Sequence, residues 1–213
     1  MLRGKRILIT SGPTRAQLDA VRYLTNISTG RFGCLLAKEA RRRGARVTFI
    51  HGKGSKTPSG ARCVEVVTNQ DVARILKKEL THKHYHIVIH AMAVLDFRPM
   101  AVGKTKTASR GSGWILHLKP APKIIARIKT WSPKTMLVGF KLEVGLTQKE
   151  LLQRARRLLK EAKADFILAN QLTEGEDQKH VGWLLDKKGR VIGTARGKMP
   201  LAKLIFSALE KTI

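Results

Sequence analysis

The feature that most constrains the fold is a repeated alternation of short apolar runs with amphipathic segments of helical period. The apolar runs are nearly continuous, which is typical of strands buried on both faces. This rhythm predicts an α/β fold of Rossmann-like type, in which a three-layer, mostly parallel sheet carries helices on both faces. The 213 residues can bury a sizeable core, and we expect a single domain over residues 1–213.

The expected elements follow in chain order. A basic, glycine-containing segment at about 97–113 has almost no apolar period and predicts a mobile flap. A turn at 186–189 joins two short runs and predicts a C-terminal hairpin. Strands are predicted at 7–10, 46–50, 62–67, 86–91, 114–118, 136–140 and 165–169, hairpin strands at 181–185 and 191–194, and helices around 35–40, 68–80, 120–128, 147–162 and 201–209.

Charge is the unusual part of the composition. The chain has 42 Lys and Arg against 15 Asp and Glu, a net charge of +27. Such a charge attracts polyanions. The basic residues are scattered, however, and the few aromatic residues are not interleaved with them. We therefore interpret most of the charge as solvated helix faces and do not expect nucleic acid as a ligand. A non-catalytic, basic nucleotide- or RNA-binding protein of this fold is the alternative.

No window is apolar for long enough to span a membrane, so we expect no membrane association. The two cysteines, Cys34 and Cys63, have neither paired nor metal-type spacing. Both are interpreted as buried thiols of a reducing compartment, which predicts a cytoplasmic protein.

The stretch from Ile7 to Gly33 contains a strand, a loop broken at Ser11-Gly12-Pro13, and a helix start. Unpaired N–H groups at a helix start favour phosphate, so this arrangement is typical of phosphate binding. The glycines do not have the spacing of the dinucleotide-binding fingerprint. An ordinary connection whose glycines only turn the chain is the alternative.

Other catalytic and metal-binding motifs are absent from the sequence. Gly103-Lys104-Thr105 lacks the upstream glycine, the strand and the helix of a P-loop. The histidines at 82, 84, 86 and 90 are interpreted as surface and core residues, because no cysteine or carboxylate completes a metal site near them. No nucleophile motif is present, so the chemistry must depend on positioning and charge.

Two polar residues stand where ligands are expected. Asn26 lies in the opening loop, where an amide can donate and accept, although asparagine is also common in turns. Asp96 follows a predicted parallel strand, and open α/β sheets bind ligands beyond the carboxyl ends of their strands. A capping aspartate is the alternative.

Four segments of the sequence, taken together, are more specific evidence of function than any of these single residues. The opening segment reads Thr10-x-Gly12-x-Thr14-Arg15-x-x-x-Asp19-x-Val21-Arg22-Tyr23-x-Thr25-Asn26-x-Ser28-Thr29-Gly30-x-x-Gly33. It is followed by Ala91-Met92-Ala93-Val94-Leu95-Asp96-Phe97-Arg98-Pro99, by Val138-Gly139-Phe140-x-x-Glu143 and by Ile167-Leu168-Ala169-Asn170. In this order the segments resemble the motifs of the phosphopantothenate–cysteine ligase family, over nearly the whole chain.

The resemblance implies an enzyme of coenzyme A biosynthesis that joins 4′-phosphopantothenate to L-cysteine. CTP is the expected nucleotide and ATP is possible. The implied intermediate is an acyl nucleotidylate, with release of pyrophosphate and CMP. Mg²⁺ is expected on the triphosphate, with no protein side chain as metal ligand and no flavin. A homodimer and a separate phosphopantothenoylcysteine decarboxylase are the implied partners. A dehydrogenase, a second alternative, would bind NAD(P) instead.

The resemblance also implies roles for individual residues. Asn26 would hold the acyl group of the intermediate, and Lys106 would neutralise the triphosphate. The opening segment departs from the family by losing an acid at Ala16, and the flap has lost lysines, for which Lys104 or Arg110 are candidates. The nucleotide contacts implied are Gly12, Thr14, Ser28, Gly30, Ala93, Val94, Asp96, Pro122, Lys123, Ile124, Ile125, Phe140, Lys163 and Lys160, and the substrate contacts are Arg22, Asn26, Ala169 and Asn170.

Overall fold

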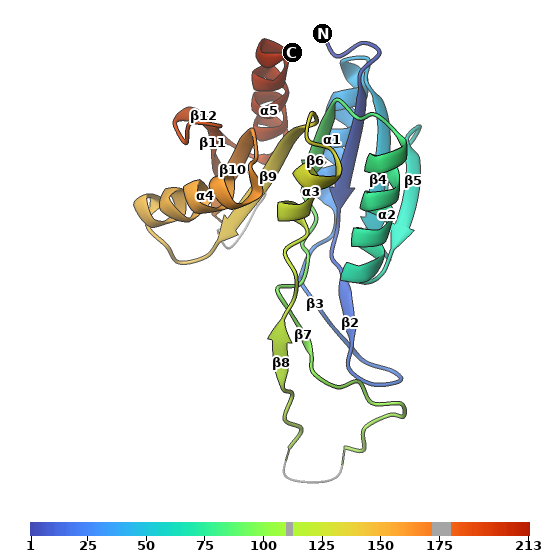
Figure 1. Cartoon of the computed structure of the whole chain (residues 1–213). Coiled ribbons are helices and arrows are strands. Elements are labelled where there is room, and N and C mark those ends of the chain that lie inside the picture. Colours follow the sequence, from blue (N-terminus) through green and yellow to red (C-terminus); the bar gives the residue numbers. More distant parts are fainter. Residues whose placement is uncertain (110–112, 172–179) are drawn as a thin grey trace.

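A computed structural model describes residues 1–109, 113–171 and 180–213. Its centre is an eight-stranded sheet in the order β12-β11-β10-β9-β6-β1-β4-β5 (Figure 1). The strands from β10 to β5 run parallel, and β11 and β12 form an antiparallel hairpin at one edge. The strands are β1 (Arg6–Ser11), β4 (Arg46–Gly52), β5 (Arg62–Val66), β6 (Ile87–His90), β9 (Met136–Glu143), β10 (Phe166–Gln171), β11 (Val181–Asp186) and β12 (Val191–Arg196).

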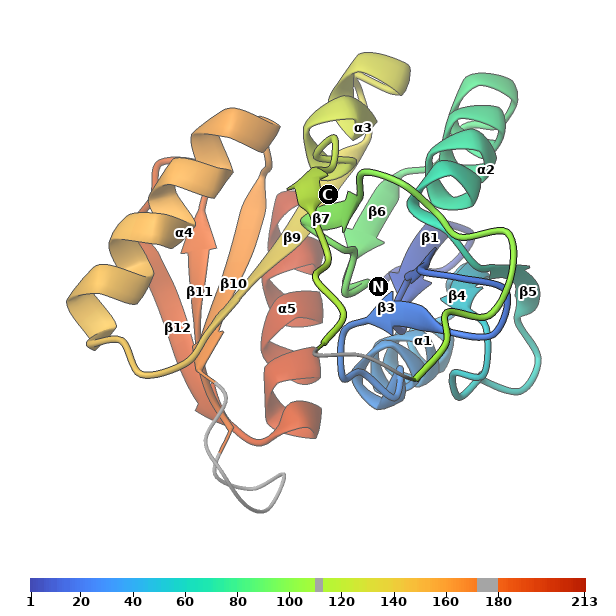
Figure 2. The same cartoon turned by 90° about the horizontal axis from the view of Figure 1, so that it is seen from below.

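Helices cover both faces of this sheet. The helices α1 (Arg31–Arg42) and α5 (Lys198–Thr212) lie on one face, and α2 (Asn69–His82), α3 (Ile125–Trp131) and α4 (Gln148–Ala162) lie on the other (Figure 2). Each face has its own apolar cluster, one around Ile9, Phe49 and Phe206 and the other around Leu76 and Ile128. The predicted three-layer, Rossmann-like α/β fold with a C-terminal hairpin is confirmed.

Local signals fix where the longer helices begin. Thr68 and Thr147 are the N-caps of α2 and α4, and each forms a capping box with an acid three residues later. Such boxes satisfy N–H groups that a helix start leaves unpaired. The helix α1 begins instead at Gly30, whose φ of 74° is left-handed and suits glycine.

Two short ribbons project beyond the carboxyl ends of the parallel strands and form an arm, which we define as residues 13–27 and 97–120 (Figure 1). One ribbon pairs β2 (Arg15–Gln17) with β3 (Tyr23–Thr25), and the other pairs β7 (Phe97–Pro99) with β8 (Leu118–Pro120). The two segments are tied to each other, because the N–H of Gly103 donates to the carbonyl of Leu18 at 3.0 Å. The loop predicted from Ser11-Gly12-Pro13 to the start of the first helix is therefore partly a hairpin.

Some sequence predictions are wrong in detail. The strand predicted at 114–118 is irregular over 114–117, and β8 begins only at Leu118. Pro120 belongs to that strand and not to a helix, and α3 begins at Ile125. The thiols are not both buried either: Cys34 is half-buried and Cys63 is exposed. The mobility of the flap stays a prediction, and its residues 110–112 lie outside the described part.

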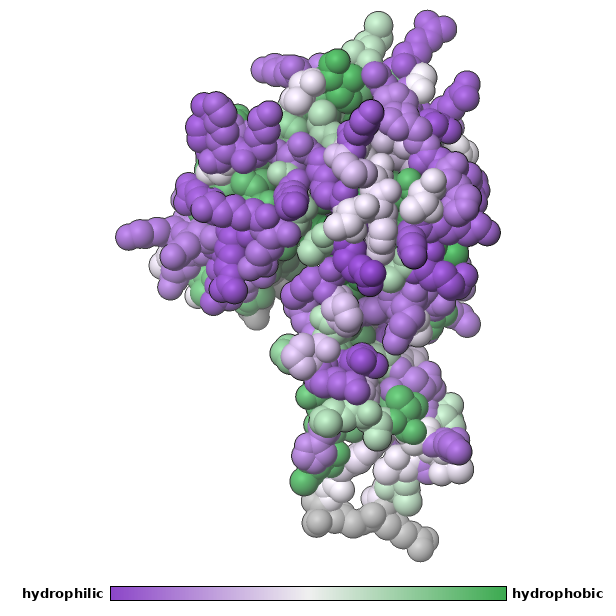
Figure 3. All heavy atoms as spheres, viewed as in Figure 1, coloured by the Kyte–Doolittle hydropathy of each residue, from purple (hydrophilic) through white to green (hydrophobic). Residues whose placement is uncertain are grey.

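The surface of the arm differs from that of the sheet and its helices. Hydrophilic side chains dominate the upper part of the visible face, whereas apolar side chains gather on the arm (Figure 3). The arm's exposed large apolar residues are Val21, Tyr23, Ile27, Phe97, Met100, Val102, Trp114, Ile115, Leu116 and Leu118. A helix long and apolar enough to cross a membrane is not found in the described residues.

Candidate functional site

The candidate site lies where the loops after β1 and β6 meet. These strands are neighbours at the centre of the sheet, and the chain connections diverge on either side of them. Open α/β sheets bind ligands at this switch point. Pro13 bridges to Ala93 in parallel fashion. The N–H of Ala93 donates to Gly12 O at 2.8 Å, and the N–H of Thr14 donates to Ala93 O at 3.2 Å. The two loops therefore form one platform.

Thr14 and Asn69 fix this platform to the start of α2. The hydroxyl of Thr14 donates to Oδ1 of Asn69 at 2.6 Å and accepts from the N–H of Leu95 at 3.0 Å. Nδ2 of Asn69 in turn donates to Leu95 O at 2.8 Å. Thr14 is fully buried, so its side chain supports the loops rather than offering an open hydroxyl to a nucleotide. Sequence reasoning missed Asn69, which belongs to no motif.

Asn26 lies against the same platform, and its role towards an acyl group stays a prediction. Its side-chain Nδ2 donates to Ala93 O at 3.2 Å and to Val94 O at 3.3 Å. The residue is otherwise exposed. The first and second motifs thus come together through Asn26, although they are far apart in the sequence.

The glycines of the opening loop permit close packing at the start of α1. A Cβ on Gly12, whose φ is 76°, would lie 1.9 Å from Oγ of Ser55. A Cβ on Gly33 would lie 2.1 Å from Oγ of Ser11. A larger residue at Gly12 would therefore push the opening loop away from the loop after β4, and one at Gly33 would push it away from the start of α1. Ser28 is half-buried, and Gly30 is buried at the N-cap of α1.

Asp96 and the residues before α3 meet across the platform. Nζ of Lys123 lies 2.5 Å from Oδ1 of Asp96, and both side chains are mostly exposed. The carbonyl of Asp96 accepts from the N–H of Ala121 at 2.8 Å. Ile124 is buried in the core. Of the four predicted contacts 122–125, Lys123 is therefore the one whose polar group reaches Asp96, while Pro122 is exposed and Ile125 is half-buried.

Phe140 and Asn170 lie on the neighbouring strands near the same end of the sheet. Phe140 follows Gly139, which pairs with His90, the last residue of β6. Its ring packs edge-on against Phe32 of α1, with centroids 5.7 Å apart. Asn170 is buried, and its Nδ2 lies 2.8 Å from Nε2 of His180. Its Oδ1 is a buried acceptor with no partner among the described residues. The predicted substrate contact Ala169 is fully buried in the core.

Lys160 and Lys163 are not near this site. Lys163 is the C-cap of α4, in left-handed conformation, and precedes the start of β10. A helix that follows a parallel strand returns to the amino end of the sheet, so both lysines lie at the end opposite the platform. Their predicted phosphate contact within one chain is therefore wrong. A basic residue at the correct end is Lys141, which pairs with Glu143 at 3.0 Å.

Lys104 and Lys106 are exposed in the arm, and Arg110 lies outside the described residues. Arg22 pairs with the buried Asp19 at 2.5 Å, and its guanidinium lies over the Trp114 ring at 5.3 Å. Burial alone would raise the pKa of Asp19, but hydrogen bonds from Thr107, Val21 and Arg22 outweigh it and hold this pKa well below its ordinary value.

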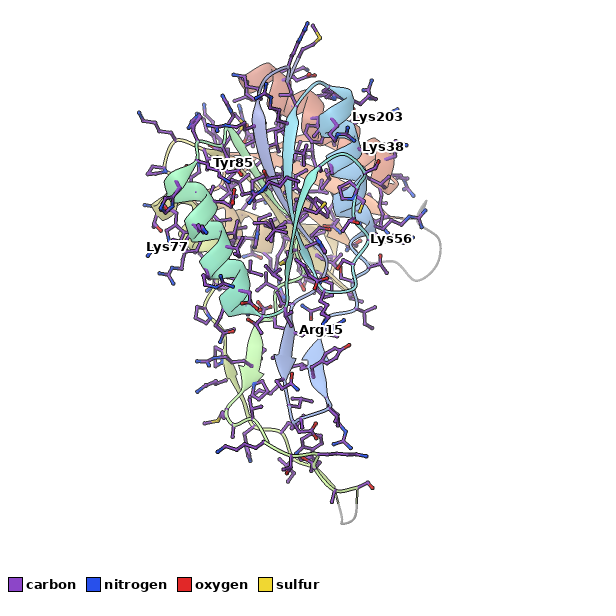
Figure 4. The ribbon with its side chains drawn as sticks, turned by 90° about the vertical axis from the view of Figure 1, so that its right-hand side faces the viewer. Arg15, Lys38, Lys56, Lys77, Tyr85 and Lys203 are labelled. Atoms are coloured by element: carbon purple, nitrogen blue, oxygen red, sulfur yellow. The ribbon has the colours of Figure 1, made fainter. Side chains whose placement is uncertain are left out.

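A hollow of about 210 Å³ adjoins the platform and is lined by residues that include Arg15, Asn69, Leu95, Phe97 and Arg98. Another, of about 430 Å³, lies between α5 and the β11–β12 hairpin. Arg15 lies where the arm leaves the sheet, whereas Lys38, Lys56 and Lys203 lie along the side of α1 and α5 (Figure 4). The hollow beside the platform therefore has arginines at its edge.

His90 lies beneath the platform. Its Nδ1 is 2.8 Å from Oγ1 of Thr10, and burial lowers its pKa to about 4. The imidazole is therefore neutral at pH 7. No group of three or more His, Cys, Asp and Glu side chains suited to a metal ion occurs in the described ranges. That Mg²⁺ would be held through a triphosphate stays a prediction.

The fold and site define an α/β protein with a ligand platform at the switch point of a doubly wound sheet. The chain belongs to the family described as DNA/pantothenate metabolism flavoprotein C-terminal domain, which matches residues 2–212. The family resemblance found in the four motifs is thereby confirmed.

Similar proteins agree with this assignment. The chain is 37% identical over 212 residues to the coenzyme A biosynthesis bifunctional protein CoaBC of Thermococcus kodakarensis, covering 100% of this chain and 52% of that protein. It is similar to the DNA/pantothenate metabolism flavoprotein from Streptococcus pneumoniae, with a TM-score of 0.89, 28% identity, and 99% and 100% of the chains covered. A Cab2 mutant in complex with phosphopantothenate-cysteine shares the fold at 20% identity and a TM-score of 0.79, with 98% and 87% covered. The chain spans about half the length of the CoaBC relatives that it matches.

Proposed function

We propose that the chain is a phosphopantothenate–cysteine ligase that uses CTP. In the first step a carboxylate oxygen of 4′-phosphopantothenate attacks the α-phosphorus of CTP, and pyrophosphate leaves. In the second step the amine of cysteine attacks the acyl carbon, CMP leaves, and the amine loses a proton. Mg²⁺ bound through the triphosphate supplies electrostatic stabilisation of the leaving pyrophosphate.

The observation that supports this proposal most is the meeting of two motifs at Asn26. The amide nitrogen of Asn26 reaches the carbonyls of Ala93 and Val94 at 3.2 and 3.3 Å, on the platform where ligands of such sheets bind. Once this amide turns from these carbonyls to the acyl group, it is a neutral donor that can polarise the acyl carbonyl without repelling the incoming amine. Lys106 supplies charge for the triphosphate from the arm, and Lys123 and Asp96 lie beside the nucleoside.

The test separates the two half-reactions of the purified chain. Pyrophosphate release from CTP should depend on added 4′-phosphopantothenate, and phosphopantothenoylcysteine should appear only when cysteine follows. Without pyrophosphate release under these conditions, retention of RNA would favour the non-catalytic alternative, and binding of NAD(P) would favour a dehydrogenase.

We also propose a homodimer formed through the arm. The described residues of the arm include ten exposed large apolar side chains, and exposed apolar patches mark interaction surfaces. Ile115 of the arm is 81% exposed and Ile192 of β12 is 44% exposed. Ile115→Asp should shift the mass measured by light scattering towards the monomer, and Ile192→Asp should not. A monomeric wild-type protein would contradict the dimer without affecting the ligase proposal.

The remaining partners follow from the proposed reaction. The product carries a cysteine carboxylate, so a separate phosphopantothenoylcysteine decarboxylase is the expected next enzyme. The flavin would belong to that enzyme, and we expect none on this chain. We also expect the reaction to take place in the cytoplasm.

A further inference from the structure

A buried carboxylate lies inside the otherwise exposed arm. Asp19, in the turn between β2 and β3, has no exposed surface. It is the only acidic residue in the sequence of 13–27 and 97–120, which contains several Lys and Arg residues. A buried charge needs several donors to offset the loss of its hydration.

Asp19 receives donors from both segments of the arm. Its Oδ1 accepts from the N–H groups of Val21 and Arg22 at 2.9 and 2.8 Å, which closes its own turn. Its Oδ2 accepts from Nη1 of Arg22 at 2.5 Å and from the N–H of Thr107 at 3.0 Å. One oxygen thus shapes the hairpin, and the other holds the flap.

The flap is held at two points around its lysines. The N–H of Gly103 donates to Leu18 O at 3.0 Å, and Nη1 of Arg22 donates to Thr107 O at 3.2 Å. Gly103 also lies close to Asp19, because a Cβ on the glycine would be 3.3 Å from Cβ of the aspartate. The exposed Lys104 and Lys106 therefore lie in a short span with both ends anchored.

We propose that Asp19 is a positioning residue that presents Lys104 and Lys106 by holding the flap against the β2–β3 hairpin. The anchoring follows from the contacts of the chain itself. Its consequence for the reaction depends on the proposed function, in which Lys106 neutralises the triphosphate. Asp19 acts through that lysine and need not touch the nucleotide.

Asp19→Asn preserves the size of the side chain but replaces one acceptor oxygen with a donor. In either orientation of the amide, two of the four donors lose their acceptor. Thr107→Pro removes the N–H from the flap side and leaves Asp19 intact, whereas Thr107→Ala keeps that N–H. Asp186→Asn is the control for charge, because Asp186 accepts from Lys188 N, Arg190 N and the Arg190 guanidinium in the remote β11–β12 turn.

The direct test is brief trypsin digestion of the whole chain, with cleavage after Lys104 followed by mass spectrometry. Cleavage after Lys106 is not compared, because trypsin does not cut the Lys–Pro bond that Thr107→Pro creates there. Cleavage after Lys104 should accelerate at least about tenfold in Asp19→Asn and Thr107→Pro, because lost hydrogen bonds make local opening easier. The Thr107→Ala and Asp186→Asn variants should be cleaved there at the wild-type rate. Unchanged cleavage in folded Asp19→Asn or in Thr107→Pro would overturn the proposal.

A second measurement tests the link to Lys106. The rate of pyrophosphate release should fall at least about tenfold in Asp19→Asn, and adding Lys106→Ala should cause no greater loss than Lys106→Ala alone. Additive losses would refute action through the lysine. If cleavage after Lys104 accelerates in these variants but the wild-type chain releases no pyrophosphate, the anchoring stands and the proposed function fails.

Discussion

The hydroxyl of Thr14 donates to Oδ1 of Asn69 at 2.6 Å and joins the loop after β1 to the first residue of α2. The same hydroxyl accepts from the N–H of Leu95. One buried side chain thus holds three segments around the ligand platform.

Thr14→Val should therefore destabilise the protein and weaken nucleotide binding. Valine has nearly the same shape, but it leaves the Leu95 N–H and the Asn69 carbonyl without their partner. Unpaired buried groups cost about 1–3 kcal/mol each. We expect urea unfolding to give a free energy lower by about 2 kcal/mol or more, and KM for CTP to rise. Thr14→Ser, which keeps the hydroxyl, should lose far less; equal stability of the valine and wild-type proteins would contradict the prediction.

Asn26→Asp should separate the two half-reactions. A carboxylate at this position loses the donor that would polarise the acyl carbonyl, and it would repel the carbonyls of Ala93 and Val94. Loss of a donor of this kind costs about a hundredfold to a thousandfold in rate. We expect pyrophosphate release to stay largely intact and the cysteine-dependent step to stop. Gln153→Glu makes the same change on the exposed face of α4 and should have no effect; equal loss of both steps would mean that Asn26 only shapes the loop.

Lys106→Ala and Lys106→Gln should act on the first step instead. A single charge directed at the triphosphate in a water-excluded site is worth several kcal/mol, or on the order of a thousandfold in rate. Pyrophosphate release measured with saturating 4′-phosphopantothenate should be nearly abolished. Lys104→Ala is the neighbouring control and should be mild. If Lys104→Ala is the more damaging change, the alignment of the flap with the family is wrong by two residues.

The sheet and its helices were predictable because their signals are local. Apolar runs such as Ile87–Ile89 and capping residues such as Thr68 show an element without knowledge of its neighbours. The three-residue strands of the arm have no such period. They depend on pairing between segments far apart in the sequence, such as Phe97–Pro99 with Leu118–Pro120.

Residues of the site could be predicted only where they belong to a sequence motif. Asn26 and Ala93 belong to motifs and come together, whereas Asn69 and Asp19 act through partners that the sequence does not reveal. Lys160 and Lys163 were assigned to phosphate by alignment alone. The direction of the helix after β9 excludes them, and this could have been reasoned from the predicted parallel sheet.

CTP should be preferred over ATP. The Ala91–Leu95 turn has only apolar side chains, and its segment resembles the CTP-using members of the family. The N–H groups of Ala91, Ala93, Val94 and Leu95 all donate within the protein, so the carbonyls of this turn, each of which can accept a second bond, must recognise the base. Two unpaired groups with adenine would give a preference on the order of a hundredfold. The preference is measured from initial rates of pyrophosphate release with CTP and with ATP, each at a sub-saturating concentration. Equal or faster turnover with ATP would refute the preference and leave the ligase proposal intact.

His90 should make the protein less stable as the pH falls below neutrality. Burial lowers its pKa from 6.5 to about 4, so the unfolded chain binds a proton at a pH where the folded chain does not. The stabilisation is complete above pH 6.5 and is lost as the pH falls from 6.5 towards 4.

Between pH 7 and pH 5 this single group should remove about 2 kcal/mol from the free energy of unfolding. Urea unfolding of the wild type at both pH values measures the total loss. His90→Gln can still accept from Thr10 but does not titrate, so its loss over the same interval should be smaller by about 2 kcal/mol. The comparison uses the change with pH and not the absolute stability, which the substitution itself can alter. Parallel losses in the two proteins would mean that His90 is accessible to protons in the folded state.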